Sequence, residues 1–380
     1  MKILIHAVGA AMGGGRTHLQ ALLPALAAHE SEHDYVVLVR SGMLKGLECA
    51  GIQVREIPTK SSATGIKRLY FDQWVLPRIL REGGFDICIS LLNFGPVICP
   101  TKHVIFQRNA LYFDRQYLRK EPLHRQAVNR IRGWIAGMSV RRADLVVTPS
   151  YAMRDLLADA FPKLPAHKFV VLYHGFNLRD RNRRPSQIEG TADHQNKSLS
   201  IFYPSHFARH KGYDVLIRTA SKLVDLGVDF HLTVTVSPDY WPGGFEWFQK
   251  SIMSPALEGR ITNHGSISPL DICDLYEQSD VVFFPSQCES FGFPMLEAMG
   301  AEKPLVVSDI LINQEICGAA ADYFPSSDSD AAAEKLSRLV NKEYRRDSAV
   351  RSARRFAERD WSWKAYAARF DYLMGSYDGD

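Results

Sequence analysis

Short apolar runs alternate with longer amphipathic segments along most of the chain. A first series of strand-length runs occupies residues 3–8, 35–39, 53–57, 87–91, 104–106, 145–148 and 169–172, and a second occupies 199–203, 231–236, 260–263, 281–284 and 305–308. Helical patterns lie between many of them, for example at residues 17–28 and 213–226. Continuous apolar runs are typical of buried parallel strands, and their alternation with helices predicts βαβ units.

The polar segment 177–198 separates the two series of strands. It carries Pro185 and Gly190, which favour turns and loops, so it is the best candidate for a linker. Because 380 residues exceed the usual size of a single core, we expect an α/β protein with two Rossmann-like domains facing each other across a cleft. The pattern at residues 348–377 predicts an amphipathic helix, whose apolar anchors are Phe356, Trp361, Trp363, Tyr366, Phe370 and Leu373.

Composition narrows the class of protein. A net charge of +4 is too weak to indicate nucleic-acid binding. The six cysteines form no CxxC pair, which favours buried, reduced thiols and a cytoplasmic protein. The apolar segment 87–101 is interrupted by Gly95, Pro96 and Pro100, whereas a membrane span takes about 20 apolar residues. The apolar segment at residues 1–11 is too short for a signal peptide, because glycines and Arg16 follow it at residues 13–16.

Two carboxylates stand in unusual places near the end of the chain. Glu289 follows the apolar run 281–284, and Glu297 lies eight positions later in a segment that predicts a helix. Gly292 and Pro294 favour the start of this helix, and Gly300 favours its end. Ligands of open α/β sheets bind at the carboxyl ends of strands, and helix N-termini attract anions. A carboxylate there repels phosphate, so we expect it to bind hydroxyl groups, as in a sugar-nucleotide site.

A glycine-rich segment, residues 9–17, follows the first strand. A Walker loop would need Gly and Lys where this chain has Ala10 and Arg16. A dinucleotide fingerprint would need different glycine spacing and an acid at the end of the second strand, which here is Arg40. The remaining interpretations are a tight turn, or a loop whose backbone amides, including those of Gly14 and Gly15, approach a phosphate or a sugar.

A basic turn, residues 204–212, opens the second series. Arg209, His210 and Lys211 precede a predicted helix N-terminus, where cations are unfavourable unless an anion joins them. Lysine and arginine both bind phosphate oxygens, so a diphosphate fits this turn. A solvated basic turn is the alternative.

Together these segments resemble the family 4 retaining glycosyltransferases of the GT-B fold. The resemblance rests on the E-x7-E pattern in ESFGFPMLEAMGAEKPLVVS, on the HKG turn, and on NHGSIS, TPSYAMRDLL, YHGFN and the closing DWSWKAYAARF. It covers nearly the whole chain. It implies an acceptor-binding domain at residues 1–178, a nucleotide-sugar domain at 179–355, and a C-terminal helix within 356–380 that crosses back to the first domain.

The resemblance also implies roles for particular residues. Glu289 would hold hydroxyls of the donor sugar, and Glu297 would hold the ribose. Lys211 and the backbone of Ser290, Phe291, Gly292 and Phe293 would bind the diphosphate, with Ser266 and Ile267 against the base. Catalysis would then rest on Glu289, Lys211 and Arg209.

The chain departs from the family pattern at two places. His206 stands where an arginine is usual, so either Arg209 or a protonated His206 would supply the second cation. Many members carry a histidine on the loop after the fifth strand, where this chain offers Arg108 and Asn109 as acceptor-binding candidates. An equal alternative is that Arg108 and Asn109 lie on the surface and have no role in binding. His6, at the end of the first strand, is more typical of a core residue than of a catalyst.

The expected activity is transfer of a hexose from a nucleoside-diphosphate sugar with retention of configuration. The acceptor would be a glycan or a polyprenyl-linked oligosaccharide, as in lipopolysaccharide O-antigen or other surface polysaccharide assembly, with a GDP-mannose or rhamnose-type donor. No metal and no further cofactor are expected. The alternatives are a soluble enzyme that makes a small glycoside or disaccharide, a non-catalytic sugar-nucleotide-binding module, and an NAD-dependent dehydrogenase, which Arg40 disfavours.

A basic segment at residues 115–142 predicts contact with membranes. Its arginines and lysine are interleaved with apolar residues such as Trp134 and Ile135, a pattern that suits a helix lying on anionic lipid. An ordinary helix that is buried on one side fits equally well. If the segment lies on anionic lipid, we expect a peripheral protein at the inner face of the plasma membrane.

Overall fold

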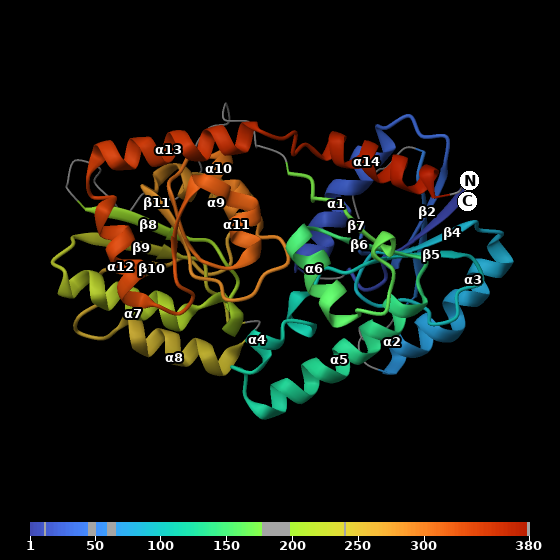
Figure 1. Ribbon diagram of the computed structural model, residues 1–380, viewed down its shortest axis with the longest axis horizontal. Coiled ribbons are helices and arrows are strands. Elements are labelled where there is room, and N and C mark those ends of the chain that lie inside the picture. Colours follow the sequence, from blue (N-terminus) through green and yellow to red (C-terminus); the bar gives the residue numbers. More distant parts are fainter. Residues whose placement is uncertain (11–12, 45–50, 59–65, 177–197, 239–240, 378–380) are drawn as a thin grey trace. The chain divides into compact units, whose positions relative to one another are not determined.

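The computed structural model describes residues 1–10, 13–44, 51–58, 66–176, 198–238 and 241–377. The chain forms two compact units (Figure 1). Unit 1 comprises Met1–Asn177 together with Trp361–Asp380, and unit 2 comprises Leu178–Asp360. The expected linker, residues 177–198, lies outside the described residues except for Ser198. Each unit is an α/β domain built on one parallel sheet, as the alternating pattern of strands and helices predicts.

The sheet of unit 1 has the strand order β3-β2-β1-β4-β5-β6-β7. Its strands are β1 (Lys2–His6), β2 (Asp34–Arg40), β3 (Gln53–Ile57), β4 (Ile87–Ser90), β5 (Lys102–Phe106), β6 (Leu145–Thr148) and β7 (Phe169–Val171). The helices are α1 (Gly13–Ala27), α2 (Ile66–Tyr70), the π-helix η1 (Phe71–Val75), α3 (Leu76–Gly83), α4 (Arg115–Leu118), α5 (Leu123–Arg142), α6 (Tyr151–Ala160) and α14 (Trp363–Ser376). The described residues of the unit also form the short 3₁₀ helices η2 (Ala110–Tyr112) and η3 (Ala166–Lys168).

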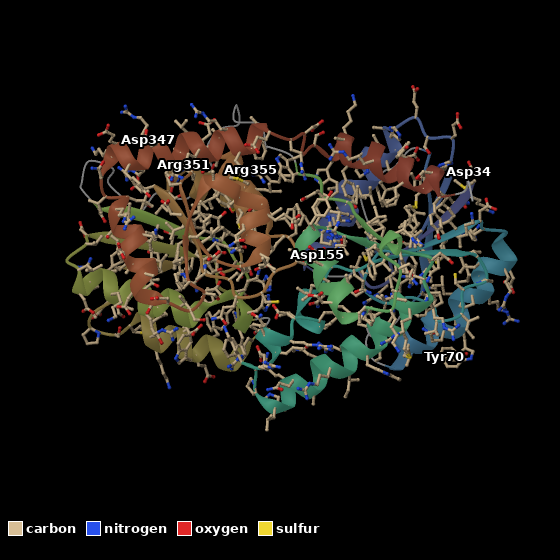
Figure 2. The ribbon with its side chains drawn as sticks, viewed as in Figure 1. Asp34, Tyr70, Asp155, Asp347, Arg351 and Arg355 are labelled. Carbon is tan, nitrogen blue, oxygen red and sulfur yellow. The ribbon has the colours of Figure 1, made fainter. Side chains whose placement is uncertain are left out.

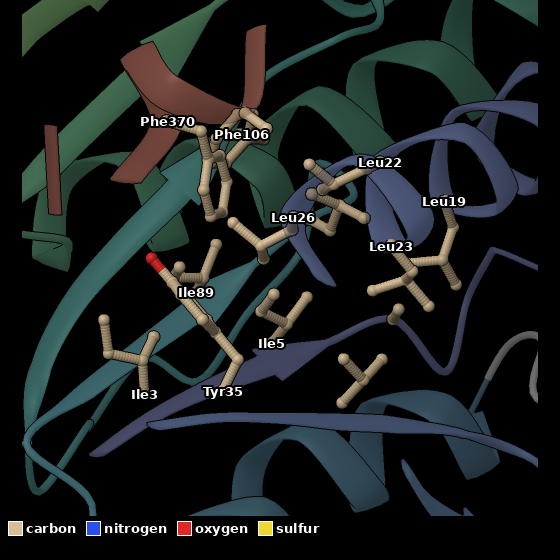
Figure 3. Close-up of a cluster of buried hydrophobic side chains, with 14 of the residues drawn as sticks. Ile3, Ile5, Leu19, Leu22, Leu23, Leu26, Tyr35, Ile89, Phe106 and Phe370 are labelled. Carbon is tan, nitrogen blue, oxygen red and sulfur yellow. The ribbon is translucent and has the colours of Figure 1, made fainter. Parts of the chain in front are cut away.

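Alternate residues of β1 face opposite sides of this sheet. Ile3 and Ile5 belong to one buried cluster, whereas Leu4 belongs to another that includes residues of α3. In the first cluster Leu19, Leu22, Leu23 and Leu26 line one face of α1 at helical spacing (Figure 3), as a helix packed on a sheet requires. Phe370 of α14 joins the same cluster, so the end of the chain completes the core of unit 1.

The sheet of unit 2 has the strand order β10-β9-β8-β11-β12-β13. Its strands are β8 (Leu199–Tyr203), β9 (Phe230–Val234), β10 (Ile261–Asn263), β11 (Val281–Phe284), β12 (Leu305–Ser308) and β13 (Ala321–Phe324). The helices are α7 (Tyr213–Asp225), α8 (Pro242–Ile252), α9 (Pro269–Gln278), α10 (Phe293–Gly300), α11 (Leu311–Cys317), α12 (Ser329–Arg338) and α13 (Lys342–Ala357), with the 3₁₀ helices η4 (Arg209–Lys211) and η5 (Gly318–Ala320). The last strand, β13, was absent from the sequence pattern.

The C-terminal segment is two helices rather than one. The pattern at residues 348–377 predicts a continuous helix, but α13 ends at Ala357 and α14 begins at Trp363. Ser362 caps α14 by accepting a hydrogen bond from the Ala365 amide, which favours a new helix start there. Arg351 and Arg355 hold α13 against the rest of unit 2 (Figure 2). Arg351 pairs with Asp322 at 3.4 Å, and Arg355 donates to the carbonyl oxygens of Glu315 and Ile316.

The glycine-rich segment also differs from the expectation. The predicted helix starts at residue 17, but α1 begins at Gly13, so Gly14 and Gly15 form its first turn rather than a loop. Residues 11–12 lie outside the described part of the chain. In the described segments, no helix is long and apolar enough to cross a membrane.

Candidate active site

A buried ion pair lies at the carboxyl edge of the sheet in unit 2. Lys211 ends the turn that follows β8, and Glu289 lies in the loop that follows β11. Because β8 and β11 are neighbouring strands, these two segments meet. The Lys211 ammonium nitrogen is 2.6 Å from Glu289 Oε1, and the two side chains are 8% and 11% exposed. Ser286 donates a hydrogen bond to the same carboxylate oxygen at 2.5 Å.

The ion pair keeps Glu289 ionised. Burial alone would raise the pKa of its carboxyl group, but attraction to Lys211 and the hydrogen bonds from Lys211 and Ser286 outweigh burial and lower that pKa. The site is therefore a compensated pair of charges that have been taken out of water. Such a pair is disturbed strongly by any ligand that replaces one partner.

The backbone around Lys211 is fixed by close packing. Gly212 has φ +69°, and a Cβ atom there would lie 2.1 Å from the carbonyl oxygen of Pro285, so the HKG turn needs glycine for conformation and for space. The hydroxyl of Tyr203 donates to the carbonyl oxygen of Lys211 at 2.6 Å. These contacts hold the turn after β8 in a fixed position against the loop after β11.

The other basic residues of the turn have different surroundings. Burial, and then the charge of Lys211, lower the pKa of His206 to about 4 and that of His210 to about 3, so both rings are neutral near pH 7. The Arg209 guanidinium lies over the ring of Trp241, 5.2 Å from its centroid, and Phe207 stacks on the same ring at 5.1 Å. The structure therefore brings Lys211 to Glu289 and places Arg209 on an aromatic cluster. Which residue supplies a second cation to a ligand stays a prediction.

Helix α10 begins as the sequence predicts. Gly292 precedes it with φ +93°, Pro294 stands in its first turn, and Gly300 is its last residue. Ser290 and Gly292 lie in the approach to the helix, whereas the side chain of Phe291 is buried and packs edge-on against Phe293. A ligand can therefore meet this segment chiefly through its backbone amides.

Glu297 is positioned by a tyrosine from a neighbouring helix. The hydroxyl of Tyr276, in α9, donates to Glu297 Oε2 at 2.7 Å. Tyr276 is buried, so this contact also satisfies its own hydroxyl group. Tyr276 was not predicted from the sequence, because nothing in its spacing marks it. Ser286 was also missed, although its place three residues before Glu289 is a signal that could have found it.

The predicted base-binding residues lie in the loop after β10. Asn263 shapes this loop, because its side-chain oxygen accepts hydrogen bonds from the amides of Val236 and Gly265. Ser266 is exposed and Ile267 is half-buried, so both are accessible from solvent. They stand at the same edge of the sheet as Lys211, beyond β9 in the strand order.

The candidates in unit 1 are held by local structure. Asn109 caps η2 because its side-chain oxygen accepts a hydrogen bond from the Leu111 amide. The Arg108 amide donates to Asn93, and burial lowers the pKa of the Arg108 guanidinium to about 10. His6 is buried, and its Nε2 atom pairs with Asp72 at 2.9 Å.

The described segments hold no cluster of three His, Cys, Asp or Glu side chains that could bind a metal ion.

Comparisons with known proteins identify the class. The solved structure of sucrose-phosphate synthase from Thermosynechococcus elongatus matches this chain with a TM-score of 0.77 at 16% sequence identity, over 99% of both chains. The architecture is therefore the GT-B fold, in which one chain forms two Rossmann-like domains.

The family follows from the sequence. The family model described as Glycosyl transferases group 1 matches residues 187–356, and the model described as Glycosyltransferase Family 4 matches residues 12–180. Together the two matches cover most of the chain, which belongs to the family 4 glycosyltransferases. It is accordingly a retaining glycosyltransferase, and the dehydrogenase alternative is rejected.

Two curated relatives are similar over different lengths. The O-antigen chain mannosyltransferase RfbU of Salmonella typhimurium is 22% identical over 74% of this chain and 72% of its own. A D-inositol 3-phosphate glycosyltransferase of Saccharomonospora viridis is 31% identical over 40% of this chain, and the match covers 37% of that enzyme.

Proposed function

We propose that the protein transfers a hexose from a nucleoside-diphosphate sugar bound to unit 2 onto a glycan or lipid-linked acceptor. The observation that carries the proposal is the buried Lys211–Glu289 pair at the carboxyl ends of β8 and β11. A carboxylate and an ammonium group in contact can bind the two unlike parts of a sugar diphosphate. The ammonium matches the phosphate, and the carboxylate matches the sugar hydroxyls.

Donor binding would exchange partners within this pair. A phosphate oxygen takes the place of Glu289 beside Lys211, and Glu289 then accepts hydrogen bonds from hydroxyls of the donor sugar. Because all these groups are largely buried, their interactions are stronger than in water. The exchange couples recognition of the sugar to recognition of the diphosphate.

The chemical step breaks the bond between the anomeric carbon and the phosphate oxygen. Lys211 and the amides that begin α10 stabilise the charge that develops on the departing diphosphate, which is the main electrostatic contribution. The acceptor hydroxyl attacks from the same face, and the leaving phosphate takes up its proton, so configuration is retained. Neither a metal nor a further cofactor takes part in this proposal. Glu297, held by Tyr276, binds the ribose of the nucleotide.

For the biological product we propose a surface polysaccharide such as an O-antigen, with a GDP-mannose or rhamnose-type donor. The similarity to an O-antigen chain mannosyltransferase supports this choice. The similarity to enzymes named for sucrose phosphate and inositol 3-phosphate keeps a small soluble acceptor as the second candidate.

The donor is tested by thermal unfolding of the full chain with UDP, GDP and dTDP sugars. A ligand that binds only the native state raises the melting temperature, and we expect one base to do so clearly more than the others. The same ligand should fail to stabilise Lys211→Ala. Absence of any shift in the wild type, together with absence of sugar transfer to lipid-extract acceptors, would refute the proposed function.

We further propose that unit 1 contacts an anionic membrane from the cytoplasmic side. Several large apolar side chains of α5 are exposed, among them Trp134 (63%), Ile131 (60%) and Leu123 (82%). Tyr70, on α2 (Figure 2), stacks on Trp74, and both of these rings are exposed as well. Apolar side chains among many arginines are typical of interfacial binding to anionic lipid.

Vesicle co-sedimentation tests the membrane contact. Binding to vesicles with anionic lipid should exceed binding to neutral vesicles and should weaken as salt is added. Trp134→Ser should reduce binding severalfold, whereas the control Leu311→Ser, which removes an apolar side chain of unit 2 that is 72% exposed, should not. Equal binding by both variants, or no preference for anionic lipid, would rule the contact out.

A further inference from the structure

Two arginines from different elements converge on the turn that follows β1. Arg40, the last residue of β2, donates from Nε to the carbonyl oxygen of Val8 at 3.0 Å. Arg68, on α2, lies against Gly9, where an added Cβ would be 2.6 Å from the Arg68 Nη1 atom. Burial, and then the charge of Arg68, lower the pKa of Arg40, so the two guanidinium groups repel each other.

One carboxylate compensates this pair of cations. Arg68 Nε is 2.7 Å from both carboxylate oxygens of Asp72, a buried residue of the π-helix η1. His6 lies beside Asp72, and its pKa is lowered by burial and by Arg68, so it is neutral near pH 7. Within the described ranges, no carboxylate is in ion-pair contact with Arg40. The group of Arg40, Arg68, Asp72 and His6 therefore carries two positive charges and one negative charge.

The position of this group suits a ligand. β1 and β2 are neighbouring parallel strands, and the group lies at their carboxyl ends, the edge where open α/β sheets bind ligands. Leu92 lies against both Gly9 and Gly15, so the first turn of α1 is close by, and it contains no acidic residue. A net positive charge beside a helix N-terminus is unfavourable unless an anion joins it.

We propose that Arg40 and Arg68 bind a phosphate group of the acceptor. The inference rests on the proposed function: the donor diphosphate is assigned to Lys211 in unit 2, so a second oxyanion site in unit 1 belongs to the second substrate. Guanidinium groups match phosphate oxygens with two parallel hydrogen bonds. Arg68 is held in place by Asp72. Arg40 donates from Nε to Val8, and among the described residues its two Nη groups have no hydrogen-bond partner, so they can serve as donors. The phosphate is part of either a lipid-linked diphosphate or a sugar phosphate.

Calorimetry with inorganic pyrophosphate tests the site apart from catalysis. The full chain with Lys211→Met and Glu289→Leu is used, because these two changes remove the donor-site ammonium without leaving a buried charge unpaired. We expect this variant to bind pyrophosphate, and the added change Arg40→Gln to weaken binding at least about tenfold, the loss of one charge-assisted contact. Arg40→Lys should keep part of the affinity. The control Arg78→Gln alters an exposed arginine of α3 by the same charge and should have no effect.

The source of the phosphate is distinguished with two further probes, a short-chain prenyl diphosphate and a hexose 1-phosphate. The probe whose affinity depends on Arg40 identifies the class of acceptor. With the matching acceptor, Arg40→Gln should raise its KM at least about tenfold and leave the donor KM unchanged. Pyrophosphate that binds equally well without Arg40, or does not bind the protein with Lys211→Met and Glu289→Leu, overturns the inference. Sugar transfer by the wild type tests the proposed function separately.

Discussion

Lys211 and Glu289 neutralise each other inside unit 2, so removing either side chain leaves the other charge buried. We expect Glu289→Ala to lower the free energy of unfolding by about 3–5 kcal/mol and to reduce sugar transfer at least about 100-fold. Replacing both residues, Lys211→Met with Glu289→Leu, should restore most of the stability because no charge is left unpaired. Transfer should stay lost. Denaturant unfolding and turnover measured on the same samples separate the two effects.

The control for this pair is Glu82→Ala, which breaks the exposed pair of Arg78 and Glu82. Exposed pairs contribute about 0–1 kcal/mol, so stability should hardly change. A Glu289→Ala protein that keeps wild-type transfer would show that the carboxylate has no part in the reaction.

The lowered pKa of Glu289 also predicts how stability depends on pH. A carboxyl group with a lower pKa in the folded state stabilises the fold above its ordinary value of 4.5, and this contribution is lost as the pH falls through the lowered value. The difference in unfolding free energy between wild type and Glu289→Gln should therefore be constant above about pH 5 and shrink in more acidic solution. Denaturant unfolding curves recorded between about pH 3 and pH 7 measure this difference. A difference that grows toward low pH would contradict the lowered pKa of Glu289.

At the scale of elements, the junction between η4 and α7 depends on one glycine. Gly212 and Gly227 both have a positive φ, +69° and +68°, but a Cβ at Gly227 would meet nothing within 4 Å. Gly227→Ala should thus cost only the backbone strain, about 1–2 kcal/mol. Gly212→Ala adds a clash with the Pro285 carbonyl and should cost more and displace Lys211 from Glu289. Equal losses of stability in the two variants would show that the close approach at Pro285 is unimportant.

At the scale of the whole molecule, the last helix belongs to the first unit. Phe370 and Tyr366 of α14 are buried in the core of unit 1, and Tyr366 makes a 3.0 Å hydrogen bond with His18 of α1. We expect Phe370→Ala to cost about 3–5 kcal/mol. The loss should appear as faster hydrogen exchange in β1, β2 and α1, with little change in unit 2. Uniform loss of protection across both units would contradict this assignment of α14.

Much of the fold could be predicted because its signals are local. Apolar runs mark the strands to within a few residues, and Gly292, Pro294 and Gly300 place α10 correctly. The errors have local causes too. The glycines before residue 17 predict a loop, yet they begin α1, and Ser362 divides the tail into two helices by capping the second. Packing against the sheet outweighs the weak intrinsic preference of glycine for other conformations.

The sequence by itself determined the family and the two parallel sheets, and it predicted which polar residues lie at strand ends, because spacing along the chain fixes which groups end up there. Only the tertiary structure decided how these groups are paired. Lys211 and Glu289 are 78 positions apart, Tyr276 reaches Glu297 from another helix, and Arg68 meets His6 across Asp72. Such contacts follow from strand order and from burial. Burial makes His206 and His210 neutral, whereas the contacts with Lys211 and Ser286 keep Glu289 ionised in spite of its burial.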